Sequence, residues 1–279
     1  RGNLSLLALA ASLAITPLSQ AAAQTSQQKA QNASDYIEFG DLTGVEKFKA
    51  SGLRYTFNPT SGGYVFVAAE PFGDGVKAEY DADTGNVTFK TPDGLKVTFT
   101  AADEVPGQST PNARLFNKPN PAGGVLGGSL STPHVNAVPL SYTRFGTVFS
   151  TGAAPLDGHA FVFGVNTLPR DLPKSGSATY TAAAGGSATL AGSLTPLRLT
   201  GSSATFSADF GTGAIATTIK LVGTPAAGGA SVALDDLTGL GSISAAKPGF
   251  SGLLTGTGTV SGTFNGAFFG PEAVEFGYS

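Results

Sequence analysis

The chain has 279 residues, a formal net charge of −3 and only 13% charged residues, so it carries no basic footprint of the kind that binds nucleic acid. It has no cysteine, which excludes disulfides, thiolate metal sites and a cysteine-linked lipid anchor. Its 39 glycines, with abundant Ser, Thr and Ala, favour an all-β protein with many turns. It also lacks Met, which predicts that Arg1 is not the natural start.

The first segment predicts export. An apolar run over Leu4–Ile15 is followed by the small residues Ala21, Ala22 and Ala23 and then by polar residues. This order is typical of a secretory signal peptide over residues 1–23, cleaved near Gln24. The alternative, a buried helix, has no polar face to support it, and the run is shorter than the roughly 20 residues of a membrane-spanning helix.

The next segment, residues 36–102, predicts a small antiparallel meander after a flexible stretch at 24–35. Ser51–Asn58 alternates apolar and polar side chains, and Gly63–Ala69 is a denser apolar run. The Asp83–Asn86 segment is a turn sequence, as expected between the strands of hairpins. We also expect one short helix within residues 40–50.

Prolines and glycines dominate residues 103–139, and we interpret this stretch as a long linker or surface loop. The alternative is that part of it pairs with the first sheet. The predicted domains are therefore a small β-rich domain with its linker over 36–135, and a second β domain over 136–279.

Short β-type segments recur from Leu140 to the end, at the regular spacing of an all-β barrel or sandwich. A closed barrel of about eight antiparallel strands would remove the exposed sheet edges that so apolar a chain must avoid. The glycines of Gly256–Gly266 suit tight bends at barrel corners.

Three motifs in this last block resemble the barrel of bacterial transferrin-binding protein B. The closing segment, Gly258–Ser279, has a Gly, an aromatic pair, Gly-Pro, a short acidic turn and a final Gly-containing strand. Phe161–Gly164 leads through two prolines to Ser175–Tyr180, and Ala208–Gly213 matches a turn in the middle of the barrel. The motifs occur in family order.

The resemblance implies an exported barrel preceded by a smaller β "handle" domain, acting in iron or haem acquisition. The implied partners are haem or an iron-carrying protein, together with an outer-membrane receptor, at the surface of a Gram-negative bacterium or secreted from it. The family receptor has two lobes and is usually a lipoprotein, whereas this chain has room for one lobe and has no cysteine. It therefore looks like the single-lobe, solute-binding relatives, some of which carry haem.

Candidate ligand-binding residues are His134, Tyr55 and Tyr64. His134 lies in a predicted loop, where its imidazole would serve as an axial ligand of haem, and the tyrosines would stack on haem or ligate it. The plain alternatives are a solvated loop histidine and aromatic residues of a small sheet core. The other histidine, His159, follows Asp157-Gly158 and is expected to be an ordinary residue at a strand end.

No enzyme motif is present: the chain has no G-x-S-x-G, no H-E-x-x-H and no phosphate-binding GKS or GKT. Asp81–Asn86 resembles half of a calcium loop without its closing Glu, so we interpret it as a hairpin turn. Two function classes remain. The first is a binding protein without catalytic activity, and the second is a structural or adhesive surface barrel with no small ligand. An integral barrel needs strands of about 9–11 residues, and the segments here are shorter.

Overall fold

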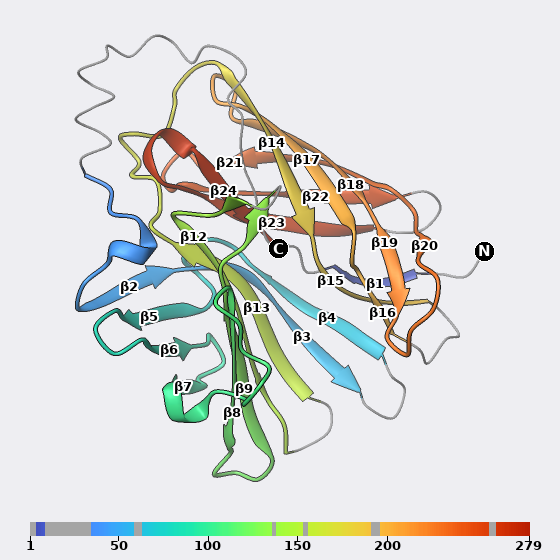
Figure 1. Cartoon of the computed structure of the whole chain (residues 1–279). Coiled ribbons are helices and arrows are strands. Elements are labelled where there is room, and N and C mark those ends of the chain that lie inside the picture. Colours follow the sequence, from blue (N-terminus) through green and yellow to red (C-terminus); the bar gives the residue numbers. More distant parts are fainter. Residues whose placement is uncertain are drawn as a thin grey trace.

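The computed structural model describes residues 4–8, 35–58, 63–135, 138–152, 156–190, 196–256 and 261–279. These residues form strands and turns, which confirms the all-β prediction (Figure 1). The helical elements described are single 3-10 turns: η1 (Phe39–Asp41), η2 (Ala101–Asp103) and η3 (Pro271–Ala273). Within these ranges, no helix has both the length and the apolar character needed to cross a membrane.

A six-stranded antiparallel sheet forms the larger layer of the N-terminal part, in the order β4-β3-β13-β12-β9-β8. The strands are β4 (Gly63–Glu70), β3 (Ser51–Asn58), β13 (Leu156–Gly164), β12 (Thr143–Ser150), β9 (Val125–Ser131) and β8 (Ala113–Pro119). The register places His159 of β13 opposite Arg54 of β3, although the two lie far apart in the sequence. β4 is an edge strand, since it pairs only with β3 in this sheet.

The interpretation of residues 103–139 as a linker is wrong, and the alternative left open by the sequence is correct. Both β8 and β9 come from this stretch and pair with each other, and β9 also pairs with β12. Gly127 and Gly128 lie inside β9. Both positions require glycine because the rings of Phe149 and Phe99 occupy the space that a Cβ would fill. Glycine here provides room for packing within a strand and does not mark a loop.

A four-stranded meander forms the second layer, in the order β2-β5-β6-β7. Its strands are β2 (Val45–Lys49), β5 (Lys77–Asp81), β6 (Asn86–Lys90) and β7 (Lys96–Phe99). Within residues 40–50, where we expected a short helix, β2 occupies residues 45–49, and only the end of the single turn η1 overlaps the start of the segment. The turn between β5 and β6 is the predicted one: the Asp81 carboxylate accepts the N–H groups of Asp83 and Thr84, and Gly85 has a φ of 70°.

Aromatic side chains from both layers form one core between the sheets. The rings of Phe89 (β6) and Phe161 (β13) lie 5.0 Å apart, and those of Phe99 (β7) and Phe116 (β8) lie 5.1 Å apart. All four side chains are fully buried. We call this two-layer unit, built from the six- and four-stranded sheets, the handle-like region.

The C-terminal part is a seven-stranded antiparallel sheet, in the order β14-β17-β18-β21-β22-β23-β24, that curls into a nearly closed barrel. Its strands are β14 (Ser177–Ala184), β17 (Ser202–Asp209), β18 (Ala214–Lys220), β21 (Leu237–Ile243), β22 (Gly249–Gly256), β23 (Ser261–Phe269) and β24 (Glu275–Tyr278). The first and last strands meet through side chains: the rings of Tyr180 and Phe276 lie 4.8 Å apart. The Tyr180 hydroxyl also donates a hydrogen bond to the Ala273 carbonyl at 2.8 Å.

Two smaller sheets complete the described structure. One has the order β1-β15-β16-β19-β20, and the other is the hairpin β10-β11. The strands are β1 (Leu4–Ala8), β15 (Gly186–Leu190), β16 (Leu197–Arg198), β19 (Val222–Pro225), β20 (Val232–Ala233), β10 (His134–Val135) and β11 (Val138–Pro139). β1 belongs to the expected signal peptide, whose cleavage site at Ala21–Ala23 lies outside the described residues.

The boundary between the two cores falls later than the predicted division between residues 135 and 136. The core of the handle-like region includes Phe163, and the barrel core begins at Tyr180. β12 and β13 lie after residue 136 but complete the six-stranded sheet, because they pair with β9 and β3. A third, smaller cluster, with Phe72, Val162 and Phe269, joins the two units.

Candidate functional site

The edge strand β4 exposes three consecutive apolar residues, which we call the β4 patch. Val65, Phe66 and Val67 are 57%, 46% and 45% exposed. A regular strand would turn alternate side chains inward, but the pairing of β3 with β4 shifts register between Arg54 and Tyr55 and leaves Val67 unpaired. Among the described residues β4 pairs only with β3, and an apolar sheet edge of this kind is able to receive another chain, by apolar contact or by adding a strand.

Two of the predicted site residues lie beside this patch. Tyr55 of β3 is paired with Phe66 of β4, and the rings of Tyr55 and Tyr64 lie 5.8 Å apart, edge to face. The Phe57 ring lies 4.7 Å from that of Tyr64. Tyr55 covers Gly158, where a Cβ would approach its hydroxyl oxygen to 2.7 Å. The structure therefore brings Tyr55 and Tyr64 into one aromatic group next to the β4 patch.

The surroundings of Tyr55 do not favour ligation of iron. Burial raises the pKa of its hydroxyl above the ordinary value, and the nearby Tyr64 acts in the same direction. A tyrosine that binds haem iron does so as the phenolate, the form that burial disfavours. Tyr55 is better placed to pack against an apolar or aromatic surface than to hold a metal.

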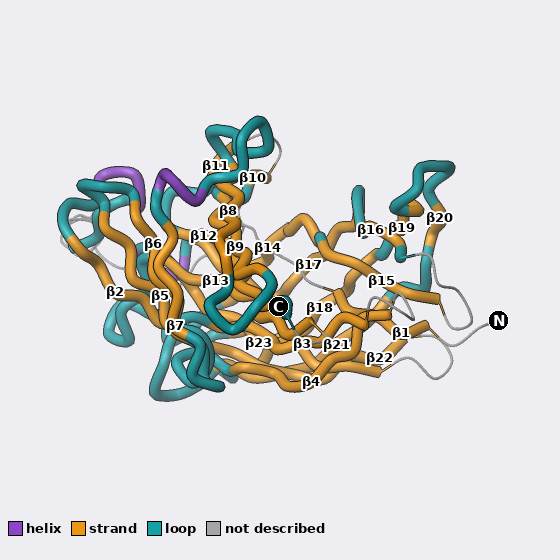
Figure 2. The backbone as a smooth tube through the Cα atoms, turned by 90° about the horizontal axis from the view of Figure 1, so that it is seen from below, coloured by secondary structure: helices purple, strands orange, loops and turns teal. Residues whose placement is uncertain are grey.

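The third predicted residue, His134, is separate from this aromatic group. It lies in β10, whose hairpin is next to β14. Its Nδ1 lies 2.9 Å from the Thr132 carbonyl oxygen, two residues earlier. Figure 2 shows β10 and β11 on the opposite side of the molecule from β4. His134 and the two tyrosines do not form one haem pocket.

An ionic cluster in the handle-like region, with a buried His159–Glu70 pair and the more exposed Asp93 and Arg54 beside it, was missed by the sequence reasoning. His159 is only 2% exposed, within β13 and not at its end, and its Nδ1 lies 2.7 Å from Glu70 Oε1. Its Nε2 lies 3.4 Å from Asp93 Oδ1, and Asp93 also pairs with Arg54 at 3.4 Å. Glu70, Asp93 and His159 come from three different strands or turns. The cluster could therefore not be predicted from the spacing of residues along the sequence.

The electrostatics of this cluster hold two layers together. Partial burial acts to raise the pKa of Asp93, but the Thr91 hydroxyl and the charges of His159 and Arg54 outweigh it, and the pKa lies below the ordinary value. Within the described part of the chain, Glu70 Oε2 and His159 Nε2 have no hydrogen-bond partner. Among the described residues, no group of three or more His, Asp or Glu side chains is arranged to hold a metal ion.

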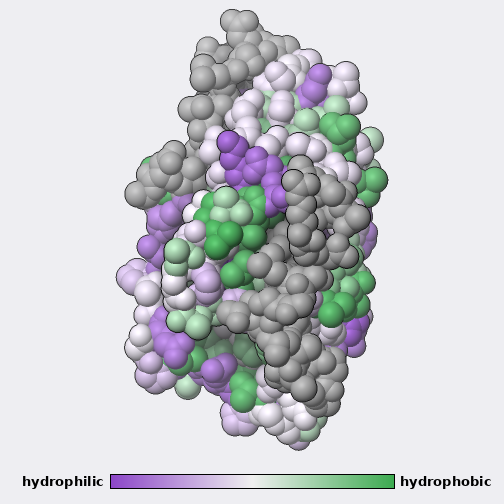
Figure 3. All heavy atoms as spheres, turned by 90° about the vertical axis from the view of Figure 1, so that its right-hand side faces the viewer, coloured by the Kyte–Doolittle hydropathy of each residue, from purple (hydrophilic) through white to green (hydrophobic). Residues whose placement is uncertain are grey.

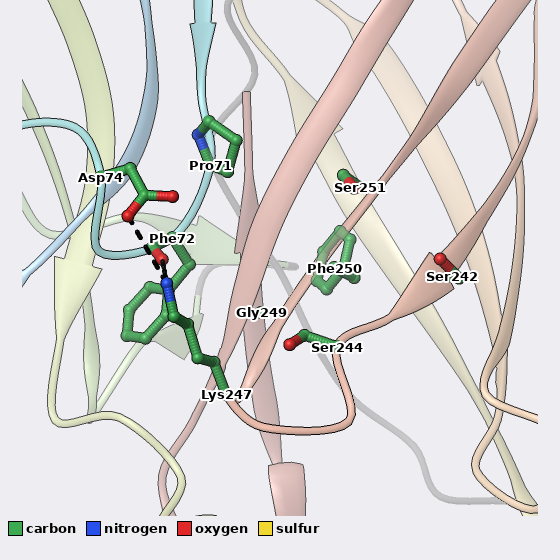
Figure 4. Close-up of a pocket in the computed structure, with 9 residues that line it drawn as sticks. All are labelled: Pro71, Phe72, Asp74, Ser242, Ser244, Lys247, Gly249, Phe250 and Ser251. Atoms are coloured by element: carbon green, nitrogen blue, oxygen red, sulfur yellow. Dashed lines mark hydrogen bonds and ion pairs between the residues drawn. The ribbon is translucent and has the colours of Figure 1, made fainter.

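A cavity of about 240 Å³ lies between the handle-like region and the barrel (Figure 4). Phe72 and Asp74 form one wall, and Phe250 and the turn that carries Lys247 form the other. The Lys247 ammonium lies 3.5 Å from both the Asp74 carboxylate and the Phe72 carbonyl oxygen. The charged groups of this cavity, Lys247 and Asp74, are thus already paired with each other.

Apolar surface also occurs elsewhere. Figure 3 shows separate hydrophobic areas between polar ones on one face of the molecule. On the barrel, Leu240 and Leu253 are cross-strand partners and are 76% and 68% exposed. These leucines form a pair on the barrel, whereas the β4 patch has three apolar residues in a row on a sheet edge, an arrangement that native proteins usually avoid.

Comparison with known proteins gives matches among solved structures only. The chain is similar to transferrin-binding protein B. The isotype 1 protein of serogroup B Neisseria meningitidis aligns over 85% of this chain and 73% of its own, with 14% identity and a TM-score of 0.33. The N-lobe domain of lactoferrin-binding protein B of Moraxella bovis aligns over 85% of this chain and 98% of its own, with 11% identity and a TM-score of 0.30. No protein-family model and no curated protein matches.

Proposed function

We propose that this chain is an exported bacterial binding protein of the transferrin-binding-protein-like type, which binds an iron-carrying protein through the β4 patch. The observation that carries the proposal is the exposure of Val65, Phe66 and Val67 on an edge strand. The part of the proposal that concerns iron rests on the resemblance of Gly258–Ser279 to the closing motif of that family. Export rests on the predicted signal peptide.

The chemistry of the patch favours a protein over a small ligand. None of its three residues lines either of the two cavities described above and below, and small-molecule sites are concave pockets. Its apolar side chains supply contact area, and β4, which among the described residues pairs only with β3, offers a sheet edge to a strand of the partner. Tyr64, beside the patch, adds an amphipathic ring of the kind enriched at interfaces.

The test is a binding assay by surface plasmon resonance with iron-loaded and iron-free transferrin and lactoferrin. We expect Phe66→Asp to weaken binding by about tenfold or more, since it places a charge at the centre of an apolar contact. The matched control is Leu253→Asp, because Leu253 is also an exposed apolar strand residue, at 68%, but lies on the barrel.

Haem remains the other proposed ligand, with His134, Tyr55 and Tyr64 as the residues to replace. A visible-absorption titration with haemin tests it, and loss of a Soret shift in Tyr64→Phe would favour haem. If the chain binds neither iron-carrying proteins nor haemin, the proposal is contradicted. The alternative function, a structural or adhesive surface protein with no small ligand, would then be favoured. An equal loss of binding in Phe66→Asp and Leu253→Asp would contradict the assignment to the β4 patch.

A further inference from the structure

A second cavity, of about 190 Å³, lies in the handle-like region away from β4. It lies between the two layers, where η1 and β5 face β8, β9 and the start of β12. One buried cation lies in its wall: Arg144, near the start of β12, is only 9% exposed. A buried guanidinium normally has a carboxylate partner, because removing an unpaired charge from water is costly.

Arg144 has no such partner among the described residues. Its Nη1 donates to the carbonyl oxygens of Leu140 at 2.9 Å and Thr143 at 2.7 Å. Its Cζ lies 4.2 Å from the centre of the Phe39 ring, so one face of the guanidinium is covered. A guanidinium has five N–H donors, and the described acceptors take only those of Nη1. The N–H groups of Nε and Nη2 remain without a described acceptor.

The charged groups around Arg144 do not replace a direct partner. Glu275, Tyr80 and Glu38 act on it from a distance and raise its pKa, but desolvation is larger and lowers that pKa to about 10. The Glu275 carboxylate is already held by the N–H groups of Ser141, Tyr142 and Thr143. The other arginine of the cavity, Arg114, is neutralised by Glu104 at 2.7 Å. Among the described residues, Arg144 therefore has no carboxylate in direct contact at the cavity.

Arg144 lines the cavity and its Nε and Nη2 have no described acceptor, so the chemistry of these N–H groups and of the other lining residues indicates which ligand fits the cavity. Nε–H and one Nη2–H of a guanidinium point in parallel, which matches the two oxygens of a carboxylate. Phe39, Leu42, Tyr80 and Leu130 line the rest of the cavity with apolar and aromatic surface. A water molecule in the liquid occupies roughly 30 Å³, so a cavity of this volume has room for a small molecule and not for a macromolecule.

We propose that this cavity binds a small organic carboxylate with an apolar or aromatic body, whose carboxylate pairs with Nε and Nη2 of Arg144. The site is separate from the β4 patch and goes beyond the proposed function, so either is able to fail without the other. Thr132 and Asn112, also in the lining, supply further polar groups at its margin.

The test uses benzoate as the probe and benzamide, its uncharged analogue, as the control ligand, at constant ionic strength. Backbone amide shifts in NMR spectra of the full chain report the position and affinity of binding. We expect benzoate to shift amides of residues 140–144 and 112–114, and benzamide to bind at least about tenfold more weakly, as the loss of a charged hydrogen bond predicts. Inorganic phosphate is the third probe and is expected to bind more weakly than benzoate, because it has no apolar body.

Three variants locate the site. Arg144→Gln is expected to lose benzoate binding by about tenfold or more. Because that change also removes the bonds to Leu140 and Thr143, Ala113→Leu is the second variant: it fills the cavity and leaves Arg144 in place. Arg170→Gln is the matched control, since Arg170 is an exposed arginine at 64%. Equal binding of benzoate and benzamide, no benzoate shifts at residues 140–144, or unchanged affinity in Ala113→Leu would each overturn the proposal.

Discussion

At the scale of single residues, the buried contact between His159 and Glu70 is an interaction between polar side chains that no local sequence pattern predicts. Their side chains are 3% and 7% exposed and lie 2.7 Å apart. His159 was expected at a strand end because Asp157-Gly158 precedes it. Instead, Asp157 pairs with Arg54 at 3.2 Å, and Gly158 lies under the Tyr55 ring, so the strand continues through both.

We predict that His159→Leu lowers the free energy of unfolding by about 3 kcal/mol, because it leaves the Glu70 carboxylate buried and unpaired. The double variant Glu70→Leu with His159→Leu should lose less than the single one, since it removes both polar groups. Urea denaturation of the two variants and the wild type measures this. The matched control pair is Glu79 with Lys90, which lie 3.0 Å apart at the surface and should change stability by less than about 1 kcal/mol. Strictly additive losses at His159 and Glu70 would contradict the coupling.

Asp93 gives a prediction for pH. Since its folded-state pKa is lowered from 3.8, it contributes stability above pH 3.8 that is lost as the pH falls through the folded value. Asp93→Asn should therefore be less stable than the wild type at pH 7, by less than about 1 kcal/mol because the carboxylate is partly exposed. The difference should vanish in acid. Urea midpoints measured from pH 7 down to pH 2 test this, and a difference that is constant with pH would contradict it.

At the scale of elements, the sequence predicts hairpins well and glycine-rich strands poorly. The β5–β6 hairpin follows from alternating side chains and a turn sequence, both of them local signals. β9 was missed because its glycines usually indicate a turn. Their cause lies in other strands: the rings of Phe149 on β12 and Phe99 on β7 occupy the space beside Gly127 and Gly128. A packing constraint between distant strands leaves no local signal.

The barrel uses glycine in the same way, and this predicts the effect of adding a methyl group. A Cβ at Gly252 of β22 would lie 2.5 Å from Cε1 of the buried Phe264 ring. We expect Gly252→Ala to lower the free energy of unfolding by about 1–3 kcal/mol through overpacking. Gly262→Ala on β23 is the control, since its nearest neighbour is 3.9 Å away, and it should have little effect. Thermal unfolding followed by circular dichroism compares the two, and equal effects would contradict the packing argument.

At the scale of the whole molecule, the handle-like region and the barrel are joined by buried polar contacts as well as by packing. Asn265 of β23 donates to the Gly52 carbonyl of β3 at 3.0 Å, and Tyr36 donates to Asp171 at 3.0 Å. Val162 of β13 packs with Phe269 of β23. The sequence predicted the two units and their order. It did not predict this junction or the exposure of β4, since both depend on register and on contacts between distant strands.

Glu275 on β24, which is 3% exposed, also contributes to the junction. Its carboxylate accepts the N–H groups of Ser141, Tyr142 and Thr143 at 2.8, 3.0 and 2.9 Å, and the Thr143 hydroxyl at 2.9 Å. One side chain from the last strand of the barrel thereby satisfies the backbone at the start of β12. Burial raises the pKa of Glu275, and these hydrogen bonds act against that rise.

This contact should make the two units unfold together. In the wild type, we expect urea transitions reported by near-ultraviolet circular dichroism and by amide exchange in each unit to coincide. Glu275→Ala leaves buried N–H groups without an acceptor and should cost about 3 kcal/mol or more. The stability that is lost should be the free energy that couples the two units. The unfolding transitions of the handle-like region and the barrel should therefore separate. Glu46→Ala, at an exposed position of β2, is the control. Coincident transitions in Glu275→Ala, shifted together, would show that packing around Val162 couples the units without the carboxylate.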